Sequence, residues 1–280
     1  MEKQKIVITK DNYRSEHSHL SYSRVSRFIQ CEAATIANYY SPSSKSQLVG
    51  SYVDAYFSNE LEEFKQEHPE IFNSKTGELK ADYKNADELI ARIESDEEMM
   101  YYMSGEKQVI MVGEIDRVPF KIKMDSYLAA EAIVDLKVMK DFNKVWSDTF
   151  GRYTNFVKAY DYDIEMAIFQ EIVYQNTGKR LPCYIVAITK ESPSDVGIFE
   201  ISQSVLDDAL ETVKRYLRRY KKVKNGEVAP TRCEKCEYCR MTKKAKIIDF
   251  ELIGANGDEL REQGYDCVDP IVNNKEGENK

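Results

Sequence analysis

Apolar residues recur every three to four positions in the first third of the chain, which predicts helices. We expect these helices over residues 20–40, 47–64 and 86–94. Ser21 or Ser23 is the expected N-cap of the first helix. Its expected buried stripe consists of Val25, Phe28, Ile29 and Ala33.

The period then changes to two, which is typical of strands. Three consecutive strands are predicted over residues 108–118, 119–125 and 131–139. Helical spacing returns over residues 160–177, with Gly178 as the expected C-cap. The remaining elements are a hairpin of residues 183–190 and 196–202 and an amphipathic helix over residues 203–222, with Leu206, Leu210, Val213 and Leu217 on one face. This order predicts a mixed α/β fold with helices flanking a central sheet.

Strand parity places three charged residues on one side of this sheet. If Phe120, Ile122 and Met124 face a core, Asp125 faces the other way. The same alternation in the next strand directs Asp135 and Lys137 away from the core. Two neighbouring carboxylates repel each other unless a cation lies between them, and hard oxygen ligands suit Mg²⁺ or Mn²⁺. We therefore expect a metal site at Asp125 and Asp135, with Lys137 assisting a bound water.

Asp-x-Lys alone is a weak signal that occurs by chance in ordinary surface ion pairs. Its weight comes from the apolar strand around it, the upstream Asp125 and the helix that follows. Glu114 and Asp116 compete with Asp125 for the first acidic position, but a solvated strand face explains them better. The spacing from Asp125 to Asp135 fits adjacent hairpin strands, so Asp125 is preferred.

The order Asp125, Asp135-Leu136-Lys137, helix and strand resembles the PD-(D/E)xK nuclease superfamily, from Leu20 to about Lys244. Within it, the chain is similar to RecE-like phage exonucleases of the RecB-like group. The resemblance implies a restriction-endonuclease-like core that binds Mg²⁺ or Mn²⁺ through Asp125, Asp135 and the Leu136 carbonyl. It also implies a helix ligand, often from Gly-x-x-x-His, where this chain has Gly50 and Asp54. Its Gln-x-x-x-Tyr motif falls on Gln170 and Tyr174, which implies DNA contacts.

Three cysteines form a C-x2-C-x2-C run, a spacing that allows thiolates to bind one soft metal ion or cluster. They are Cys233, Cys236 and Cys239, and Cys31 is a candidate fourth ligand. The RecB-like resemblance implies a [4Fe–4S] cluster with one cysteine before the core and three after it. Zn²⁺ on the same thiolates is the alternative. Cys183 is expected to be a small buried side chain, and Cys267 has no evident partner.

The 280 residues are expected to form a single nuclease domain over residues 1–250, followed by a polar tail over residues 251–280. We expect N-terminal helices over 20–95, a catalytic core over 108–222 and the cysteine cluster over 231–246. The formal net charge of −8 argues mildly against a protein that coats nucleic acid, but not against a local basic track. No signal peptide, membrane span or nucleotide-binding P-loop is evident, so we expect a cytoplasmic protein without ATPase activity.

These features favour an exodeoxyribonuclease that acts on linear duplex DNA ends and leaves single-stranded tails. The resemblance implies a role in phage or prophage recombination, with a strand-annealing protein as partner and a ring-shaped homo-oligomer. A nuclease of CRISPR adaptation with a similar four-cysteine layout is the first alternative. A DNA- or partner-binding module that keeps the fold without catalysis is the second, and Asp54 in place of histidine leaves it open.

Overall fold

A computed structural model describes residues 7–42, 44–147 and 151–270. The chain forms two compact units. The first comprises Met1–His19, Ser43–Ile115 and Pro119–Leu210, and the second comprises Leu20–Pro42, Asp116–Val118 and Glu211–Lys280. No described helix combines the length and apolar character needed to cross a bilayer.

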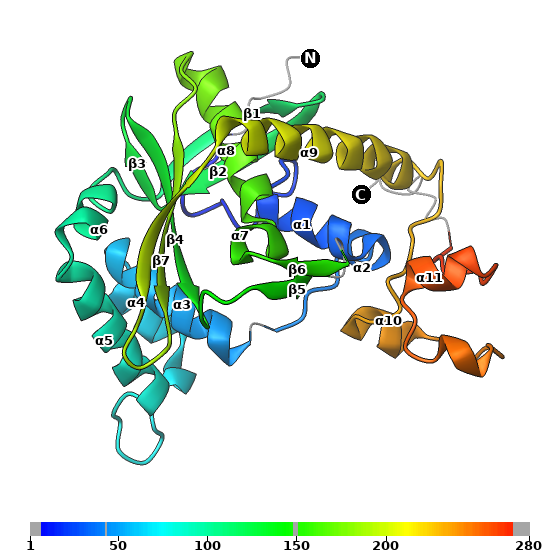
Figure 1. Cartoon of the computed structure of the whole chain (residues 1–280), viewed down its shortest axis with the longest axis horizontal. Coiled ribbons are helices and arrows are strands. Elements are labelled where there is room, and N and C mark those ends of the chain that lie inside the picture. The colour runs from blue at the N-terminus through cyan, green and yellow to red at the C-terminus, as the bar shows by residue number, and fades with distance from the viewer. Residues whose placement is uncertain (1–6, 43, 148–150, 271–280) are drawn as a thin grey trace. The chain divides into compact units, whose positions relative to one another are not determined.

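A four-stranded mixed sheet organises the first unit (Figure 1). Its order is β3 (Ser126–Leu128), β4 (Ala132–Met139), β7 (Cys183–Thr189) and β8 (Val196–Ile201). The β4–β7 pair is parallel, whereas β3–β4 and β7–β8 are antiparallel. Strands β1 (Val109–Ile115) and β2 (Val118–Met124) form a separate two-stranded sheet, as do β5 (Val145–Ser147) and β6 (Arg152–Thr154).

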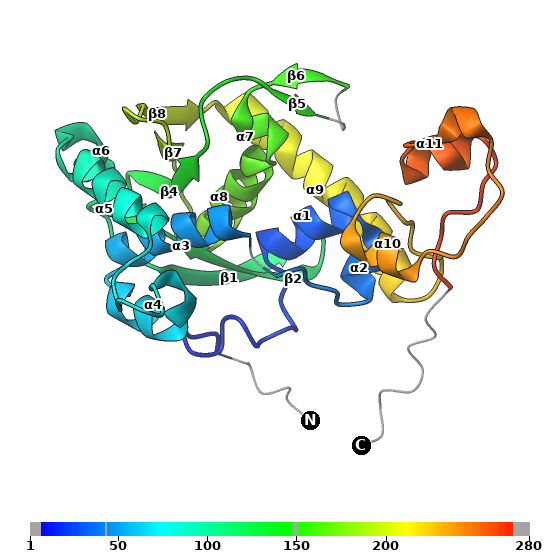
Figure 2. The ribbon, with the colours of Figure 1, turned by 90° about the horizontal axis from the view of Figure 1, so that it is seen from below.

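Helices flank the mixed sheet, which confirms the predicted α/β class (Figure 2). The helices of the first unit are α3 (Lys45–Phe57), α4 (Leu61–Glu67), α5 (Ala81–Glu94), α6 (Glu97–Tyr102), α7 (Phe156–Ala159) and α8 (Tyr162–Thr177), with a 3-10 turn η1 (Pro69–Ile71). Val134 and Leu136 of β4 lie in one core cluster with buried side chains of α3 and α5. Helix α8 contacts β4 and β1. Core packing thus fixes the strand that carries Asp135 and Lys137.

The second unit contains α1 (Tyr22–Gln30), α2 (Glu32–Ile36), α10 (Glu237–Thr242), η2 (Phe250–Leu252) and α11 (Gly257–Glu262). Helix α9 (Gln203–Lys224) begins in the first unit and continues into the second from Glu211. The four predicted apolar positions of α9 are buried. Gly178 is the C-cap of α8 and adopts a left-handed backbone conformation, as predicted.

Two predicted helices are each interrupted. The helix expected over 20–40 breaks at Cys31, whose extended backbone (φ −162°, ψ 107°) separates α1 from α2. Ser21 holds the N-cap position, but its hydroxyl contacts Ser23 and makes no capping hydrogen bond. The helix expected over 47–64 breaks before α4, where Asn59 adopts a left-handed φ of 59°. Asparagine tolerates this conformation better than most residues, which explains how the chain turns there.

Other boundaries also differ from the prediction. Helix α5 begins at Ala81 rather than at Ala86, and α6 was not predicted. The expected polar tail includes η2 and α11, and it buries Leu260 and Cys267. The last ten residues, 271–280, lie outside the described part of the chain. Apolar residues are sparse in the expected tail and show no clear period, so the sequence did not predict that Leu260 and Cys267 are buried.

Candidate functional site

Sheet register brings Asp125 and Asp135 together. Ser126 of β3 pairs with Val134 of β4, so the next step of the same register places Asp125 opposite Asp135. An Asp125 Oδ2 atom also accepts a hydrogen bond of 3.0 Å from the backbone N–H of Leu136. The predicted core positions Phe120, Ile122 and Met124 are fully buried, which fixes the chain leading to Asp125. The prediction paired the strand of residues 119–125 with that of residues 131–139, but β2 pairs with β1, and the antiparallel partner of β4 is the unpredicted strand β3.

Lys137 lies between two carboxylates. Its Nζ atom is 2.6 Å from Asp135 Oδ2 and 2.9 Å from Glu165 Oε2 of α8. It also lies 4.5 Å from the ring centroid of Tyr162. Burial disfavours the charged amine, but Asp135 and Glu165 together raise the pKa of Lys137 well above its usual value. Lys137 is therefore a fixed positive charge at neutral pH.

Glu165 is a site residue that the sequence prediction missed. Its side chain is 12% exposed, and burial raises the pKa of its carboxyl while Lys137 opposes that rise. The available signal was its position on the apolar face of α8, because Ile168, Phe169 and Ile172 follow it at helical spacing and are buried. A carboxylate at such a position needs a cationic partner. Lys137 is that partner.

Asp54 reaches this region from α3. Burial, and secondarily the carboxylate of Asp125, raise the pKa of Asp54 to about 7. Asp54 and Lys123 line a cavity of about 570 Å³ that also includes Tyr13 and Arg14 of the N-terminal segment. The amine of Lys121 fixes that segment by binding the carbonyls of Tyr13 and Glu16.

The donor chemistry of these residues fits a hard divalent cation. Asp135 is buried, and burial raises the pKa of its carboxyl well above the usual value although Lys137 lies 2.6 Å from Oδ2 and opposes that rise. Asp54 is an acid whose ionisation is disfavoured in the absence of further positive charge. A divalent cation would compensate both. Among the described residues, the four cysteines form the one group of three or more potential metal ligands whose atoms all lie within 4.8 Å of one another, so no three carboxylates converge as closely.

Gln170 and Tyr174, the two residues expected to contact DNA, lie in different environments. Gln170 is 2% exposed and hydrogen-bonds the Leu181 carbonyl at 2.9 Å and Gln203 at 3.0 Å, so the expected contact between this side chain and DNA is corrected to a structural role. Tyr174, one turn later, is 40% exposed beneath the guanidinium of Arg180. The two differ because Tyr174 lies near the exposed end of α8.

Glu114 and Asp116, the two alternatives to Asp125, are not part of the carboxylate group. Glu114 is exposed on β1, and its backbone hydrogen-bonds the side chain of Gln175. Asp116 does not continue the strand, because it adopts a positive φ in the turn after β1. The carboxylate of Asp116 binds Lys221 at 2.8 Å, which lowers the pKa of Asp116.

The four cysteines predicted as ligands form one group in the second unit. The Sγ atoms of Cys31, Cys233, Cys236 and Cys239 lie within 4.8 Å of one another. Hydrogen bonds from the Cys31 thiol and from backbone N–H groups, including that of Cys236, lower the pKa of Cys233 to about 4. Thiolates are the species that bind metal ions, so the group can hold a metal centre. Cys183 is fully buried in β7, as predicted.

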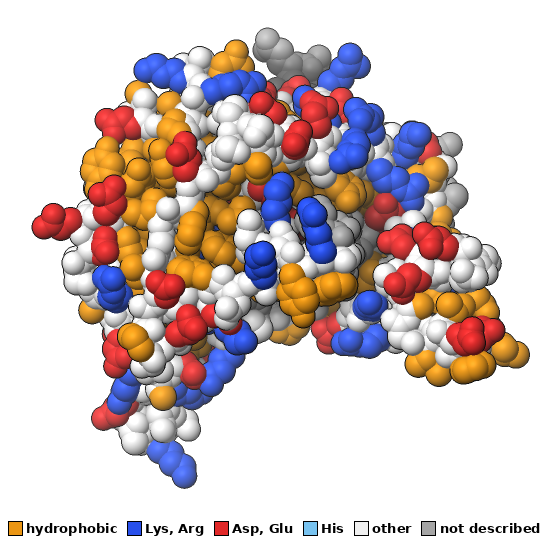
Figure 3. Space-filling view, viewed as in Figure 1, with side chains coloured by type: hydrophobic (Ala, Val, Ile, Leu, Met, Phe, Trp, Pro, Cys, Tyr) orange, Lys and Arg blue, Asp and Glu red, His pale blue; other side chains and the backbone are white. Residues whose placement is uncertain are grey.

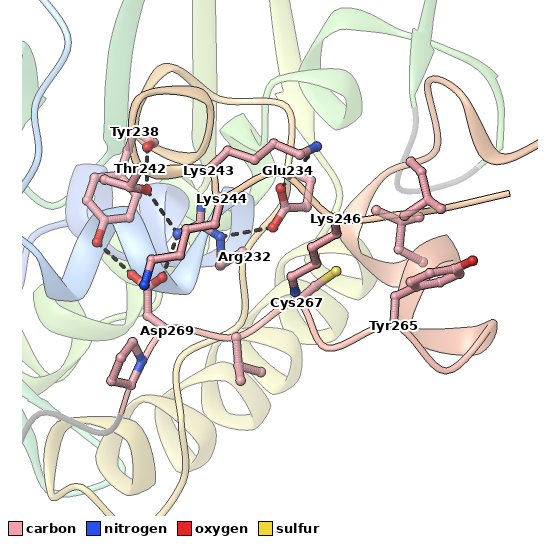
Figure 4. A pocket seen from close by; sticks show the side chains of 14 residues that line it. Arg232, Glu234, Tyr238, Thr242, Lys243, Lys244, Lys246, Tyr265, Cys267 and Asp269 are labelled. Carbon is pink, nitrogen blue, oxygen red and sulfur yellow. Dashed lines mark hydrogen bonds and ion pairs between the residues drawn. The ribbon is translucent and has the colours of Figure 1, made fainter. Parts of the chain in front are cut away.

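Arg232 ties the C-terminal segment to the loop that carries these cysteines. Its guanidinium donates to the Cys239 carbonyl at 2.7 Å and to Glu234 at 2.9 Å, and it pairs with Asp269 (Figure 4). Tyr238 donates to the other oxygen of Asp269 at 2.6 Å. These residues line a cavity of about 460 Å³. The segment beyond residue 250 therefore helps, through Asp269, to hold the residues around the cysteine group in place.

The fold and the carboxylate–lysine arrangement define a PDDEXK-type protein. The chain belongs to the family described as "PDDEXK-like domain of unknown function (DUF3799)", whose model matches residues 21–242. A solved structure from Eubacterium rectale, titled "Putative exonuclease", is similar, with 42% identity and a TM-score of 0.83. The match covers 90% of this chain and 99% of that one. No curated protein matches the chain.

Asp161 allows a test of the charge balance at the start of α8. Burial, with Asp163 adding to it, raises the pKa of Asp161 to about 6, and its backbone is left-handed (φ 59°). In the unfolded chain this carboxyl ionises near pH 4, which is below its pKa in the folded protein. The contribution of Asp161 to the free energy of unfolding therefore falls as the pH rises from about 4 to about 6, and it stays reduced above that. Asp161→Asn should therefore raise the melting temperature at pH 8 and have less effect at pH 4. Thermal unfolding at both pH values measures this difference, and an equal effect at both would contradict the assignment.

Proposed function

We propose that this protein is a metal-dependent exodeoxyribonuclease that hydrolyses phosphodiester bonds from the ends of linear duplex DNA. The observation that carries the proposal is the group of Asp125, Asp135, Lys137 and Glu165, of which Asp135 is buried and the others are partly buried, in a PDDEXK-like domain. The Eubacterium rectale structure titled "Putative exonuclease" supports exonuclease over endonuclease activity. Duplex preference, a setting in phage recombination, a strand-annealing partner and a homo-oligomer are predictions from the resemblance.

Asp54, Asp125, Asp135 and the Leu136 carbonyl would hold Mg²⁺ or Mn²⁺. When bound, such an ion lowers the pKa of a water molecule and stabilises negative charge on the phosphate. Asp125 is held in place by the Leu136 N–H, and Asp135 by the β4–β7 ladder. Lys137 stays protonated and would donate a hydrogen bond to the attacking water or to a phosphate oxygen. Glu165 positions the Lys137 amine.

The cysteine group would hold a [4Fe–4S] cluster, with Zn²⁺ as the alternative, since four thiolates accept either. Its place in the chain supports a structural role. Cys31 comes from the start of the second unit, and the other three come about 200 residues later, from the segment that leads into α10 and from α10 itself. A metal centre there would join the two segments, as the hydrogen bond of 2.8 Å from the Thr231 N–H to Glu32 already does.

Glu165→Gln tests whether Glu165 acts through Lys137. We expect cleavage of linear duplex DNA to slow by about 10- to 100-fold, the usual effect of losing a group that orients a site residue. Losing one anionic partner should also lower the pKa of Lys137, so the alkaline limb of the pH–rate profile should move to lower pH. The profile distinguishes this role from a loss of stability.

Glu171→Gln is the matched control, because Glu171 lies on the same helix and pairs with Arg180 rather than with Lys137. It should leave the rate and the pH profile near those of the wild-type protein. A Glu165→Gln protein with an unchanged profile would show that Lys137 does not depend on Glu165. Failure of the wild-type protein to cleave DNA with Mg²⁺ or Mn²⁺ would instead reject the proposed nuclease and favour the non-catalytic binding module.

A further inference from the structure

The β5–β6 hairpin lies in the connection between the two elements that carry the proposed site. It follows β4, with Asp135 and Lys137, and precedes α8, with Tyr162 and Glu165. Both ribbon views show it beside α7, which contacts β5 and α8 (Figures 1 and 2).

Aromatic packing anchors the base of the hairpin. The rings of Phe142 and Phe156 stack with centroids 5.6 Å apart, and Phe156 lies 6.3 Å from Tyr162. Tyr162 in turn contacts the amine of Lys137. The base of the hairpin is therefore connected to the site by packed side chains.

Two large aromatic side chains are exposed on this short hairpin. Trp146 and Tyr153 are cross-strand partners, 53% and 65% exposed, and their rings meet edge to face with centroids 5.5 Å apart. Trp146 is the single tryptophan of the chain. Neighbouring exposed aromatic side chains are typical of a surface that meets a ligand, because their apolar area is otherwise left in water.

Positive charge lies next to these rings. Lys144 precedes β5 and Arg152 begins β6, and both are exposed. Lys140 is also exposed but pairs with Asp141 at 3.5 Å. Lys and Arg side chains gather beside hydrophobic ones over the hairpin (Figure 3). Aromatic rings flanked by cations suit a ligand with flat bases and a phosphate backbone, which is single-stranded nucleic acid.

We propose that Trp146 and Tyr153 stack on bases of a single-stranded DNA end and that Lys144 and Arg152 bind its phosphates. The hairpin thereby holds an unpaired strand beside the proposed catalytic group. This inference rests on the proposed nuclease function and extends it, since it names the form of DNA at the site. None of these four residues was among the site residues expected from the sequence.

Tryptophan fluorescence tests the stacking directly, because Trp146 alone produces the signal. The full-length protein is titrated with a 12-nucleotide single-stranded DNA in buffer without added divalent cations, and binding is followed in parallel by anisotropy of a labelled copy. We expect saturable quenching of Trp146. The Trp146→Ala/Tyr153→Ala protein should bind about tenfold more weakly, within the roughly 5- to 150-fold range for loss of base stacking.

Three controls separate stacking from other effects. Trp146→Phe keeps an aromatic ring and should bind within about threefold of wild type. Tyr101→Ala removes another exposed aromatic side chain, on α6, and should not change binding. Heparin supplies negative charge without bases and should not quench Trp146.

Equal quenching by heparin would overturn the proposal, because charge alone would then explain the signal. Binding by anisotropy without quenching, together with an unaffected double variant, would overturn the hairpin assignment and leave the proposed nuclease standing. A wild-type protein that neither binds nor cleaves DNA would reject the proposed function, and the hairpin assignment with it.

Discussion

Replacing Asp135 with asparagine is expected to slow DNA cleavage by on the order of 10³-fold, since charge stabilisation at the reacting phosphate is usually the largest single contribution to such a rate. Asparagine matches aspartate in size but cannot supply the negative charge that holds a cation and that pairs with Lys137 at 2.6 Å. The fold should persist, because Asp135 lies on a strand fixed by ladders to β7 and by core packing. Initial rates on end-labelled linear duplex DNA, with thermal unfolding as the check on folding, measure the effect.

Asp116→Asn is the matched control for this substitution. Asp116 was a rival for the first acidic position, but its carboxylate binds Lys221 in the turn after β1. Asparagine also tolerates the positive φ found there. The control should retain a rate within about twofold of wild type. If Asp116→Asn lost activity while Asp135→Asn kept it, the site would have been assigned to the wrong carboxylate.

Replacing Cys239 with serine is expected to abolish metal binding at the proposed centre and to destabilise the second unit. Cys239 is fully buried, and its Sγ atom lies 3.6 Å from that of Cys31. Loss of a structural metal site commonly costs several kcal/mol, and about 3 kcal/mol would lower the melting temperature of a unit this size by roughly 12–24 °C. Metal analysis and thermal unfolding of anaerobically purified protein report the two effects separately.

Cys267→Ser provides the comparison, because Cys267 is a buried thiol of the same unit outside the four-cysteine group. It should keep the full metal content whatever its effect on stability. Absorption near ~400 nm in the wild-type protein would identify an iron–sulfur cluster, and a colourless protein with stoichiometric zinc would identify the alternative. Unchanged metal content in Cys239→Ser would contradict the assignment of these ligands.

Strand alternation made the centre of the site predictable. In β4 the alternation separates Asp135 and Lys137 from Val134 and Leu136, which pack in the core with α3 and α5. It did not predict that Ile133 and Asp135 on the opposite face are also buried, or that Phe120, Ile122 and Met124 lie in the separate β1–β2 sheet. The period of two is a local property of the chain and needs no knowledge of tertiary contacts. The same holds for α9, where four apolar residues at helical spacing are buried as expected. The cysteine group was predictable from spacing for three of its members.

The parts that the sequence did not reveal depend on tertiary contacts. Glu165 joins the site because α8 packs against β4, and its partner Lys137 is 28 residues away. Gln170 matched a motif in spacing, but its burial is decided by Leu181 and Gln203. Helical propensity predicted a continuous helix through Cys31, whereas the extended backbone there accompanies the convergence of its thiol with three distant cysteines.

The central claim is that this chain degrades DNA from its ends with a divalent cation. The most direct test compares linear duplex DNA with covalently closed circular DNA of the same sequence, incubated with the protein and Mg²⁺ or Mn²⁺. We predict that the linear form is shortened progressively to small products and that the circle stays intact. Absence of cleavage with either ion, or equal cleavage of the circle, would contradict the claim.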